Sequence, residues 1–416
     1  MYSKRKGAVS YLKISGIIAE YNPLHWGHVY HIRKSRERAQ VDTMIAIISS
    51  NFVQRGEPSL VDKSARAEMA MSCGVDLALE LPAAFSSCNA GVFANAAVDI
   101  LAATGQVDCI SFGMENPVEK DSLFLKIADI LNEEPDDFKI ELKKFLRNGY
   151  SFVQARSMAL ECKIPGSMEL LRRPNNNLAL AYIKRIREKN LPIETFTIER
   201  IGGGFHDTEA RDGEFASATA IRGLVYSRGV GAARALMPES SARVLERSVA
   251  NGHAVIDQDR LWRAVRLALL RTTPHELSQT ADMGEGLENR MIKEAYSSSS
   301  YDSFVERVAS RRYPKGRIRR YCVHLLLNLR KAESRKFQAN GPAYIKVLGA
   351  NERGRALLAS MRKTASLPVL SRSAGTLGAY AGEILKFEHT ATEIWETLTD
   401  NPRLHAESRI IPIMSS

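Results

Sequence analysis

The stretch EYNPLHWGHVYHI, residues 20–32, lies between a short apolar run and an amphipathic segment. The apolar run at residues 13–20 predicts a buried strand, and residues 25–40 predict a helix. Asn22-Pro23 is typical of a tight turn between the two. His25 and His28 are three residues apart, so both lie on one face of the first helical turn. The sequence therefore predicts a strand, a turn and a helix start that presents two imidazoles.

A helix start is a natural site for an anion, because its unpaired N–H groups carry partial positive charge. Two imidazoles added there can donate hydrogen bonds to the phosphates of a nucleotide and offset charge on a pyrophosphate leaving group. Gly27 has no side chain, so we expect the backbone to approach the ligand there. We predict His25 and His28 as the catalytic residues, and neither needs to act as a nucleophile. The alternative is that both only cap the helix.

Strand-like and helix-like segments alternate through the first half of the chain. Further strands are predicted at residues 43–49, 75–81, 107–112 and 193–201, and helices at residues 63–73, 90–104, 120–148 and 178–189. Strands that are apolar almost throughout, separated by amphipathic helices, indicate parallel strands covered on both faces. This predicts an α/β fold with a doubly wound, Rossmann-like parallel sheet, whose ligands bind at the carboxyl ends of the strands.

After Pro238 the pattern changes to helices with little strand signal. These helices are predicted at residues 242–250, 260–271, 286–296 and 316–332. We place the boundary near Met237–Ser240. The predicted organisation is a flexible N-terminal tail at residues 1–12, a nucleotide-binding catalytic domain at residues 13–238 and a mainly α-helical domain at residues 239–416.

Positive charge is concentrated in one part of the second half. The 416-residue chain has a formal net charge of +11, and residues 301–340 contain eleven Lys and Arg against three acidic residues. Within that segment RRYPKGRIRR mixes arginines with a tyrosine. Arginine binds phosphate with two hydrogen bonds and stacks on bases, and tyrosine also stacks. We therefore predict nucleic-acid binding through Arg317, Arg319 and Arg320, with a solvated basic helix face as the alternative.

Cysteine and histidine spacing gives no sign of a metal site. The five cysteines are scattered without CxxC spacing, and the histidines form no HExxH motif. This pattern predicts buried thiols in a reducing compartment and no bound metal. No apolar run approaches the roughly 18–20 residues needed to span a bilayer. We expect a cytoplasmic protein without a membrane partner, and no protein partner is evident.

A second candidate phosphate element is SATAIR, residues 217–222, which follows the last predicted strand of the first half and an acidic loop. Ser217 or Thr219 at a helix start can cap the helix or hold a phosphate oxygen. Arg222 would then lie one turn further along and face the same ligand. An ordinary helix cap is the alternative.

Together these motifs resemble those of the tRNA(Met) cytidine acetate ligase family, whose members are HxGH nucleotidyltransferase-like. The matching strings, in chain order, are GIIAEYNPLHWGHVYHI, SSNFVQRGEPSLVDKSARAEMA, GVDLALELP, DCISFGMEN, RRPNNNLALAY, TIERIGGGFHD, SATAIR, EGLENR, RRYPKGRIRR and YIKVLGANERGR. EYNPxHxGH together with NFxQRG is far more specific than HxGH alone. The resemblance includes the helical half of the chain.

The resemblance implies an ATP-dependent ligase. Acetate would attack ATP to give acetyl-adenylate and pyrophosphate, and the acetyl group would pass to the exocyclic amine of the wobble cytidine of elongator tRNA(Met), forming N(4)-acetylcytidine. ATP would be the co-substrate, tRNA and acetate the partners, and the basic helix a tRNA contact; Mg²⁺ fits this chemistry but cannot be read from the residues. The implied ATP-binding residues are Ile18, Ala19, Glu20, Tyr21, Asn22, Pro23, Leu24, His25, Trp26, Gly27, His28, Val29, Tyr30, His31, Gly113, Asn175 and Arg200.

Some positions leave alternatives open. Gln54, Arg55, Lys63 and Arg66 could line the acetate or tRNA side, or could belong to a solvated loop. Trp26 stands where the family commonly has a small polar residue, and it could stack on a base or pack under the helix. Two other functions share part of the pattern. One is a small-molecule nucleotidyltransferase, which would not need a basic helical half, and the other is a catalytically silent RNA-binding protein.

Overall fold

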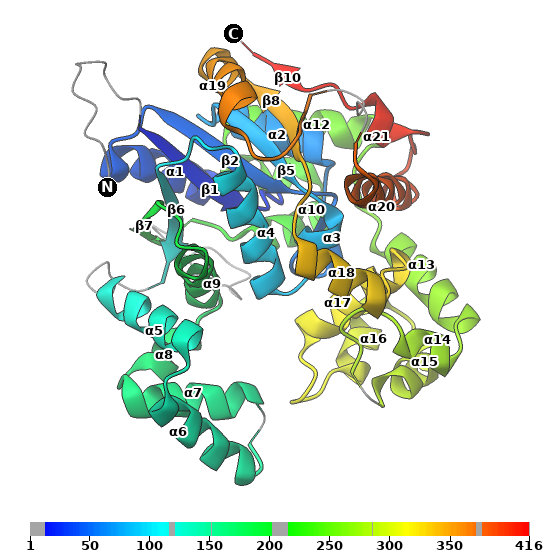
Figure 1. Cartoon of the computed structure of the whole chain (residues 1–416). Coiled ribbons are helices and arrows are strands. Elements are labelled where there is room, and N and C mark those ends of the chain that lie inside the picture. Colours follow the sequence, from blue (N-terminus) through cyan, green and yellow to red (C-terminus); the bar gives the residue numbers. More distant parts are fainter. Residues whose placement is uncertain are drawn as a thin grey trace, which may run out of the picture.

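Five parallel strands form the centre of the computed structural model, which describes residues 13–115, 121–150, 152–201, 215–284, 286–371 and 377–415 (Figure 1). They are β1 (Ile14–Ala19), β2 (Thr43–Ser49), β5 (Leu77–Leu81), β6 (Cys109–Met114) and β7 (Glu194–Glu199). Their order is β5-β2-β1-β6-β7, and each neighbouring pair is parallel. The strand order reverses between β1 and β6, so the predicted doubly wound fold is confirmed, with its ligand crevice expected at that point. The expected tail at residues 1–12 lies outside the described residues.

Helices cover both faces of this sheet. The helices α1 (Trp26–Ala39) and α2 (Lys63–Ser72) bury Ile32 and Met69 in one core with Met44 and Ile48 of β2. The intervening strand residues, such as Ile45, face the other core, where α4 (Ala90–Ala103) and α9 (Pro174–Glu188) pack. Alternate residues of one strand thus enter two cores, which explains why the strand is apolar throughout.

The segment predicted as one helical stretch at residues 120–148 is two helices, α5 (Asp121–Glu133) and α6 (Asp136–Arg147). Pro135 has no N–H to donate to a helix interior and stands instead at the N-cap of α6. With α7 (Phe152–Lys163) and α8 (Ser167–Leu171) these helices extend away from the sheet (Figure 1). Cys162 on α7 is exposed, so the expectation of buried thiols is wrong for this residue.

The C-terminal segment returns to the sheet, which the predicted boundary did not anticipate. β8 (Ile345–Ala350) lies antiparallel to β5 and parallel to β10 (Ile413–Met414), and β9 (Val369–Leu370) pairs with β8. The C-terminal part is mainly helical as predicted, but a single division near Met237–Ser240 is wrong for residues 345–414. A lone strand between helices lacks the repeated strand–helix alternation that revealed the other strands, although YIKVLG is a short apolar run.

The remaining described elements are helices and a two-stranded hairpin. The helices are α3 (Ala83–Ser86), α10 (Ala218–Arg228), α11 (Val230–Ala233), the 3₁₀ helix η2 (Arg234–Leu236), α12 (Glu239–Ala250), α13 (Gln258–Arg271), α14 (Pro274–Ser278), α15 (Leu287–Ser297), α16 (Tyr301–Val308), α17 (Lys315–Leu326), α18 (Lys331–Asn340), α19 (Glu352–Thr364), α20 (Ala379–Glu396) and α21 (Ala406–Arg409). The hairpin pairs β3 (Phe52–Val53) with β4 (Glu57–Pro58), between β2 and α2. In the part of the chain that the structure describes, no helix has the length and apolar character required to cross a membrane.

Candidate active site

His25 and His28 form a hydrogen-bonded cap at the start of α1. His25 is the N-cap residue, and its Nδ1 accepts a hydrogen bond from the backbone N–H of Gly27 at 3.1 Å. His28 reciprocates, because its Nδ1 accepts from the backbone N–H of His25 at 3.2 Å. The two rings lie 3.9 Å apart between centroids. The capping alternative is therefore a real structural role of both residues.

The cap fixes which ring nitrogen carries the proton. A backbone N–H can only donate, so Nδ1 of each ring must be unprotonated, and the proton of the neutral ring is on Nε2. Burial, reinforced by nearby Arg200, Arg55 and Arg222, lowers the pKa of His25 to about 3. Burial and the neighbouring His25 hold the pKa of His28 well below its ordinary value. Both rings are therefore neutral near pH 7, and each has one Nε2–H donor that the cap does not use.

The absence of a side chain at Gly27 leaves room for the ring of His25, and the predicted approach of a ligand there stays a prediction. A Cβ atom built at Gly27 would lie 2.9 Å from Cε1 of His25, so a side chain would displace the imidazole itself. Trp26 resolves an open alternative, because its side chain is exposed and its Nε1 donates to the carbonyl of Ala235 at 3.2 Å. Trp26 does not pack under the helix.

Hydrogen bonds from Arg66 of α2 hold the turn before α1 in place. Arg66 is fully buried and donates to the carbonyls of Glu20 at 2.7 Å and Ser50 at 2.8 Å. Asn22 accepts at Oδ1 from the N–H of Leu60 at 2.7 Å, and the Asn22-Pro23 peptide is cis. Arg66 is thus a structural residue, and the hypothesis that it lines a substrate is wrong.

Gly113, Asn175 and Arg200 come together around one carboxylate. Asn175 at the start of α9 donates from Nδ2 to Oε1 of Glu115 at 2.6 Å. Burial lowers the pKa of Arg200 and the charge of Glu115 opposes that shift, so these two side chains are neighbours. A Cβ built at Gly113 would lie 3.1 Å from Cγ of Arg200. The charge of Arg200 also contributes to the low pKa of His25, and the sequence motifs did not reveal Glu115 as the partner of Asn175.

The SATAIR segment lies against the same site. The side chains of Ser217, Thr219 and Arg222 each contact another group of the protein. Ser217 is the N-cap of α10, and its Oγ accepts from the N–H of Ala220 at 3.1 Å. Thr219 Oγ1 lies 2.8 Å from Nη1 of Arg55. Arg222 donates to the carbonyl of Asn22 at 2.7 Å and pairs with Glu57. Phosphate binding by Ser217, Thr219 and Arg222 remains a prediction.

The predicted RNA-binding arginines on α17 differ in their surroundings. The guanidinium of Arg317 lies over the rings of Tyr313 and Tyr321, at 5.3 and 5.5 Å from their centroids. Arg319 is about one-third exposed (36%) and faces Asp302 at 3.4 Å. Burial lowers the pKa of Arg320. Arg311 and Arg312, just before α17, are exposed and belong to the same basic segment.

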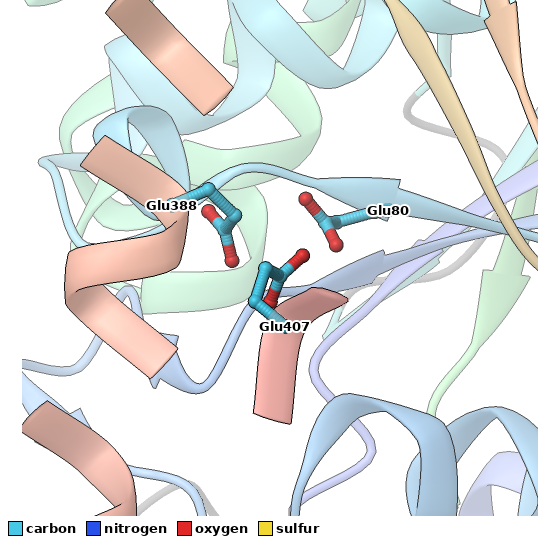
Figure 2. Close-up of side chains that lie close together, drawn as sticks. All are labelled: Glu80, Glu388 and Glu407. Carbon is cyan, nitrogen blue, oxygen red and sulfur yellow. The ribbon is translucent and has the colours of Figure 1, made fainter. Parts of the chain in front are cut away.

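Three carboxylates on β5, α20 and α21 lie close enough together to bind a cation: Glu80, Glu388 and Glu407 (Figure 2). The ammonium of Lys63 already lies among them, 2.6–2.7 Å from an oxygen of each. All four side chains are fully buried. This arrangement fills the cation position with the chain's own lysine, so we assign no metal to it. It also removes Lys63 from the residues that could line a substrate.

Comparison with known proteins identifies the family. A family model described as HIGH Nucleotidyl Transferase matches residues 12–409. The tRNA(Met) cytidine acetate ligase of Caldanaerobacter subterraneus subsp. tengcongensis is 40% identical over 364 residues, covering 86% of this chain and 88% of the relative. The protein of the same name from Clostridium perfringens is 33% identical over 412 residues, covering 97% of this chain and 100% of the relative. The chain belongs to the tRNA(Met) cytidine acetate ligase family.

Solved structures of the family have the same fold as this chain. The apo form of Thermotoga maritima TmcAL superposes with a TM-score of 0.89 at 33% identity, covering 97% of this chain and all of the other. A second form, bound with alpha-thio ATP, gives a TM-score of 0.85 at 32% identity over the same shares. The similarity covers the sheet, the helical part and the returning C-terminal segment together.

Proposed function

We propose that the chain is an ATP-dependent ligase that activates acetate as acetyl-adenylate and transfers the acetyl group to the wobble cytidine of elongator tRNA(Met), giving N(4)-acetylcytidine. The relatives at 33–40% identity carry the name tRNA(Met) cytidine acetate ligase, and a T. maritima relative was solved with an ATP analogue. The observation that carries the chemistry is the pair of neutral imidazoles at the strand-order reversal, each with an Nε2–H donor.

The residues of the site suit a triphosphate. Three arginines, Arg200, Arg55 and Arg222, lie close enough to His25 for their charges to lower its pKa. Positive charge beside two neutral hydrogen-bond donors favours binding of a polyanion. The Nε2–H groups of His25 and His28 would donate to phosphate oxygens and stabilise charge that develops on departing pyrophosphate. The acetate carboxylate would form a bond to the α-phosphorus as the bond to pyrophosphate breaks, so catalysis would consist of positioning and charge stabilisation.

We place tRNA on the basic segment that contains Arg317, Arg319 and Arg320. The exposed Arg311 and Arg312 and the partly exposed Arg319 suit phosphate contact, whereas the rings of Tyr313 and Tyr321 are buried and do not face solvent. A cytoplasmic location follows from tRNA as substrate and stays a prediction. Mg²⁺ fits the chemistry but is not predicted as a requirement. A small-molecule nucleotidyltransferase is disfavoured, because the relatives match the helical part as well as the sheet. The histidine pair, present and capped, disfavours a catalytically silent RNA-binding protein.

The test is to incubate the protein with ATP, labelled acetate and bulk tRNA, and to analyse the nucleosides. The proposal predicts label in N(4)-acetylcytidine, released from elongator tRNA(Met), with pyrophosphate formed in at least equal amount. Label in no nucleoside, with pyrophosphate still formed, would favour a small-molecule substrate. If neither labelled nucleoside nor pyrophosphate forms, the assignment as an enzyme is contradicted.

A further inference from the structure

The β3–β4 hairpin touches the candidate ATP site at one side of its turn. Arg55 donates from Nη1 to Oγ1 of Thr219 at 2.8 Å, and its Nε lies 3.8 Å from Oε2 of Glu20. The N–H of Gln54 donates to Oε1 of the same glutamate at 2.9 Å. These contacts hold the guanidinium of Arg55 between the end of β1 and the start of α10.

This position is next to the histidine pair. Arg55 lies against Glu20, five residues before His25 in the chain, and its charge contributes to the low pKa of both His25 and His28. Its side chain is 29% exposed, so solvent and ligands reach it. Arg222, by contrast, is only 6% exposed and is held by Glu57 and the carbonyl of Asn22. Of these two arginines, Arg55 is the better placed to meet an incoming phosphate.

The other side of the same turn rests on the basic helix α17. Gly56 has φ +78°, and a Cβ built there would lie 2.3 Å from the backbone N of Arg320 and 2.6 Å from the backbone C of Arg319. The turn therefore lies directly against the backbone of α17, with no room for a side chain between them. A shift of α17 toward the hairpin must therefore displace the hairpin, because packed backbones cannot interpenetrate.

We propose that Arg55 binds a phosphate of ATP, and that α17, through its contact with Gly56, sets the position of Arg55, so that tRNA bound on α17 changes the affinity for ATP. Arginine suits this role because its planar guanidinium can donate two parallel hydrogen bonds to a phosphate. The inference rests on the proposed function, since it needs ATP at the histidine pair and tRNA on α17. Arg55 is then a binding residue, and Gly56 is a positioning residue that acts through it.

The phosphate contact is tested by measuring ATP and adenosine affinity of wild type, Arg55→Gln and Arg55→Lys by calorimetry. Arg55→Gln should weaken ATP binding by roughly ten- to a hundredfold, the usual loss for a charge-assisted hydrogen bond. Adenosine, which has no phosphate, should bind all three proteins within about twofold, because the nucleoside pocket is intact. Arg55→Lys should recover part of the loss, since it keeps the charge without the planar fork. Equal losses for ATP and adenosine would mean a structural role and would overturn this part of the proposal.

The coupling is tested with Gly56→Ala and Gly166→Ala. Gly166 also has positive φ, +86°, but nothing lies within 4 Å of a Cβ built there, so its variant carries the same backbone strain without the clash. Saturating tRNA should change the ATP affinity of wild type and Gly166→Ala by at least about fivefold, the lower end of common coupling. In Gly56→Ala the change should fall below about twofold. ATP must change tRNA affinity by the same factor, which gives an independent check.

Arg55→Gln keeps the coupling test decisive even if Gly56→Ala does not fold. If the effect passes through Arg55, tRNA should no longer change ATP affinity in this variant, although tRNA itself still binds. A wild-type protein whose ATP affinity is unaffected by tRNA would overturn the coupling. That result differs from failure of the proposed function, which would show as absent tRNA binding or absent N(4)-acetylcytidine.

Discussion

His25 and His28 use their two ring nitrogens for separate tasks. Each Nδ1 accepts a backbone N–H at the start of α1, which satisfies donors that a helix end leaves unpaired. Each Nε2–H then faces away from that bond with its proton fixed. The capping role and the phosphate-donor role therefore support one another, because the cap decides the tautomer that the chemistry needs.

Replacing His28 by Ala should reduce acetate-dependent pyrophosphate formation by about a hundred- to a thousandfold, the usual cost of losing one donor to developing charge. The helix also loses a cap hydrogen bond, so stability should fall by about 1 kcal/mol. Initial rates and thermal melting of the same preparations measure both effects. His253→Ala is the matched control, because His253 is partly exposed and its ring Nδ1 lies 3.0 Å from the carbonyl oxygen of Asn401, not in the candidate site. Wild-type turnover in His28→Ala would exclude His28 from the reaction.

Acid should destabilise the protein through His25. The pKa of His25 is about 3 in the folded chain and near 6.5 when unfolded, so the unfolded state binds the extra proton between these values. Stability from this group is complete above about pH 6.5 and is lost as pH falls toward 3, by about 1.4 kcal/mol per pH unit. Buried Glu80, whose pKa is raised to about 7, titrates in the opposite sense and overlaps this range.

The measurement is therefore a difference between wild type and His25→Asn, which keeps a cap acceptor but does not titrate. Urea unfolding at pH 6, 5 and 4 should show wild type losing more stability per pH unit than the variant. Parallel loss in both proteins would mean that His25 is already charged in the folded state.

Sequence reasoning at this scale found the histidine pair but not the partners that orient it. A pattern such as HxGH reports residues that are local in the chain. Glu115 joins Asn175 across 60 residues, and Arg55 reaches Thr219 across 164, so only the fold brings them together.

At the scale of elements, α17 carries the test of RNA binding. Arg317 and Arg320 are engaged with neighbouring side chains or partly buried, so replacing them would disturb packing as well as charge. Arg311, Arg312 and Arg319 are more suitable targets because solvent reaches them.

Changing Arg311, Arg312 and Arg319 together to Gln should weaken tRNA binding for all sequences alike. Each lost phosphate contact should lower the slope of log affinity against log salt by about 0.7–0.9. Filter binding at several salt concentrations measures the slope. Exposed cations on α6, Lys139, Lys143 and Arg147, give the matched control. An unchanged slope in the α17 variant would leave its basic segment as a solvated face, with tRNA bound elsewhere.

At the scale of the whole molecule, Lys63 joins the returning C-terminal segment to the sheet. Burial alone would lower the pKa of Lys63, but Glu388, Glu407 and Glu80 together raise it. Burial would raise the pKa of Glu407, yet Lys63 and Lys346 lower it to about 2. The cluster thus ties α20 and α21 to β5, and it makes the C-terminal segment part of the central fold.

Lys63→Met should destabilise the fold by about 3–5 kcal/mol, because it leaves three buried carboxylates without their central cation. Lys163→Met is the control, since Lys163 pairs with Asp137 at the surface and should cost at most about 1 kcal/mol. Chemical unfolding compares them. Equal, small losses would show that the buried cluster contributes little to stability.

The sequence predicted the five central strands because strands and helices alternate in that part of the chain. It did not predict β8, because no such alternation surrounds that strand. Its pairing with β5 joins residues 77–79 to residues 347–350, which no local pattern can reveal. The buried Lys63 cluster depends on the same long-range return and was missed for the same reason.

The central claim is that the histidine site of the α/β half activates acetate by itself. Exchange of labelled pyrophosphate into ATP, measured without RNA, tests it most directly. Exchange should require acetate, proceed in the absence of tRNA and be lost in His28→Ala. Exchange that does not depend on acetate, or that appears only when tRNA is present, would contradict it.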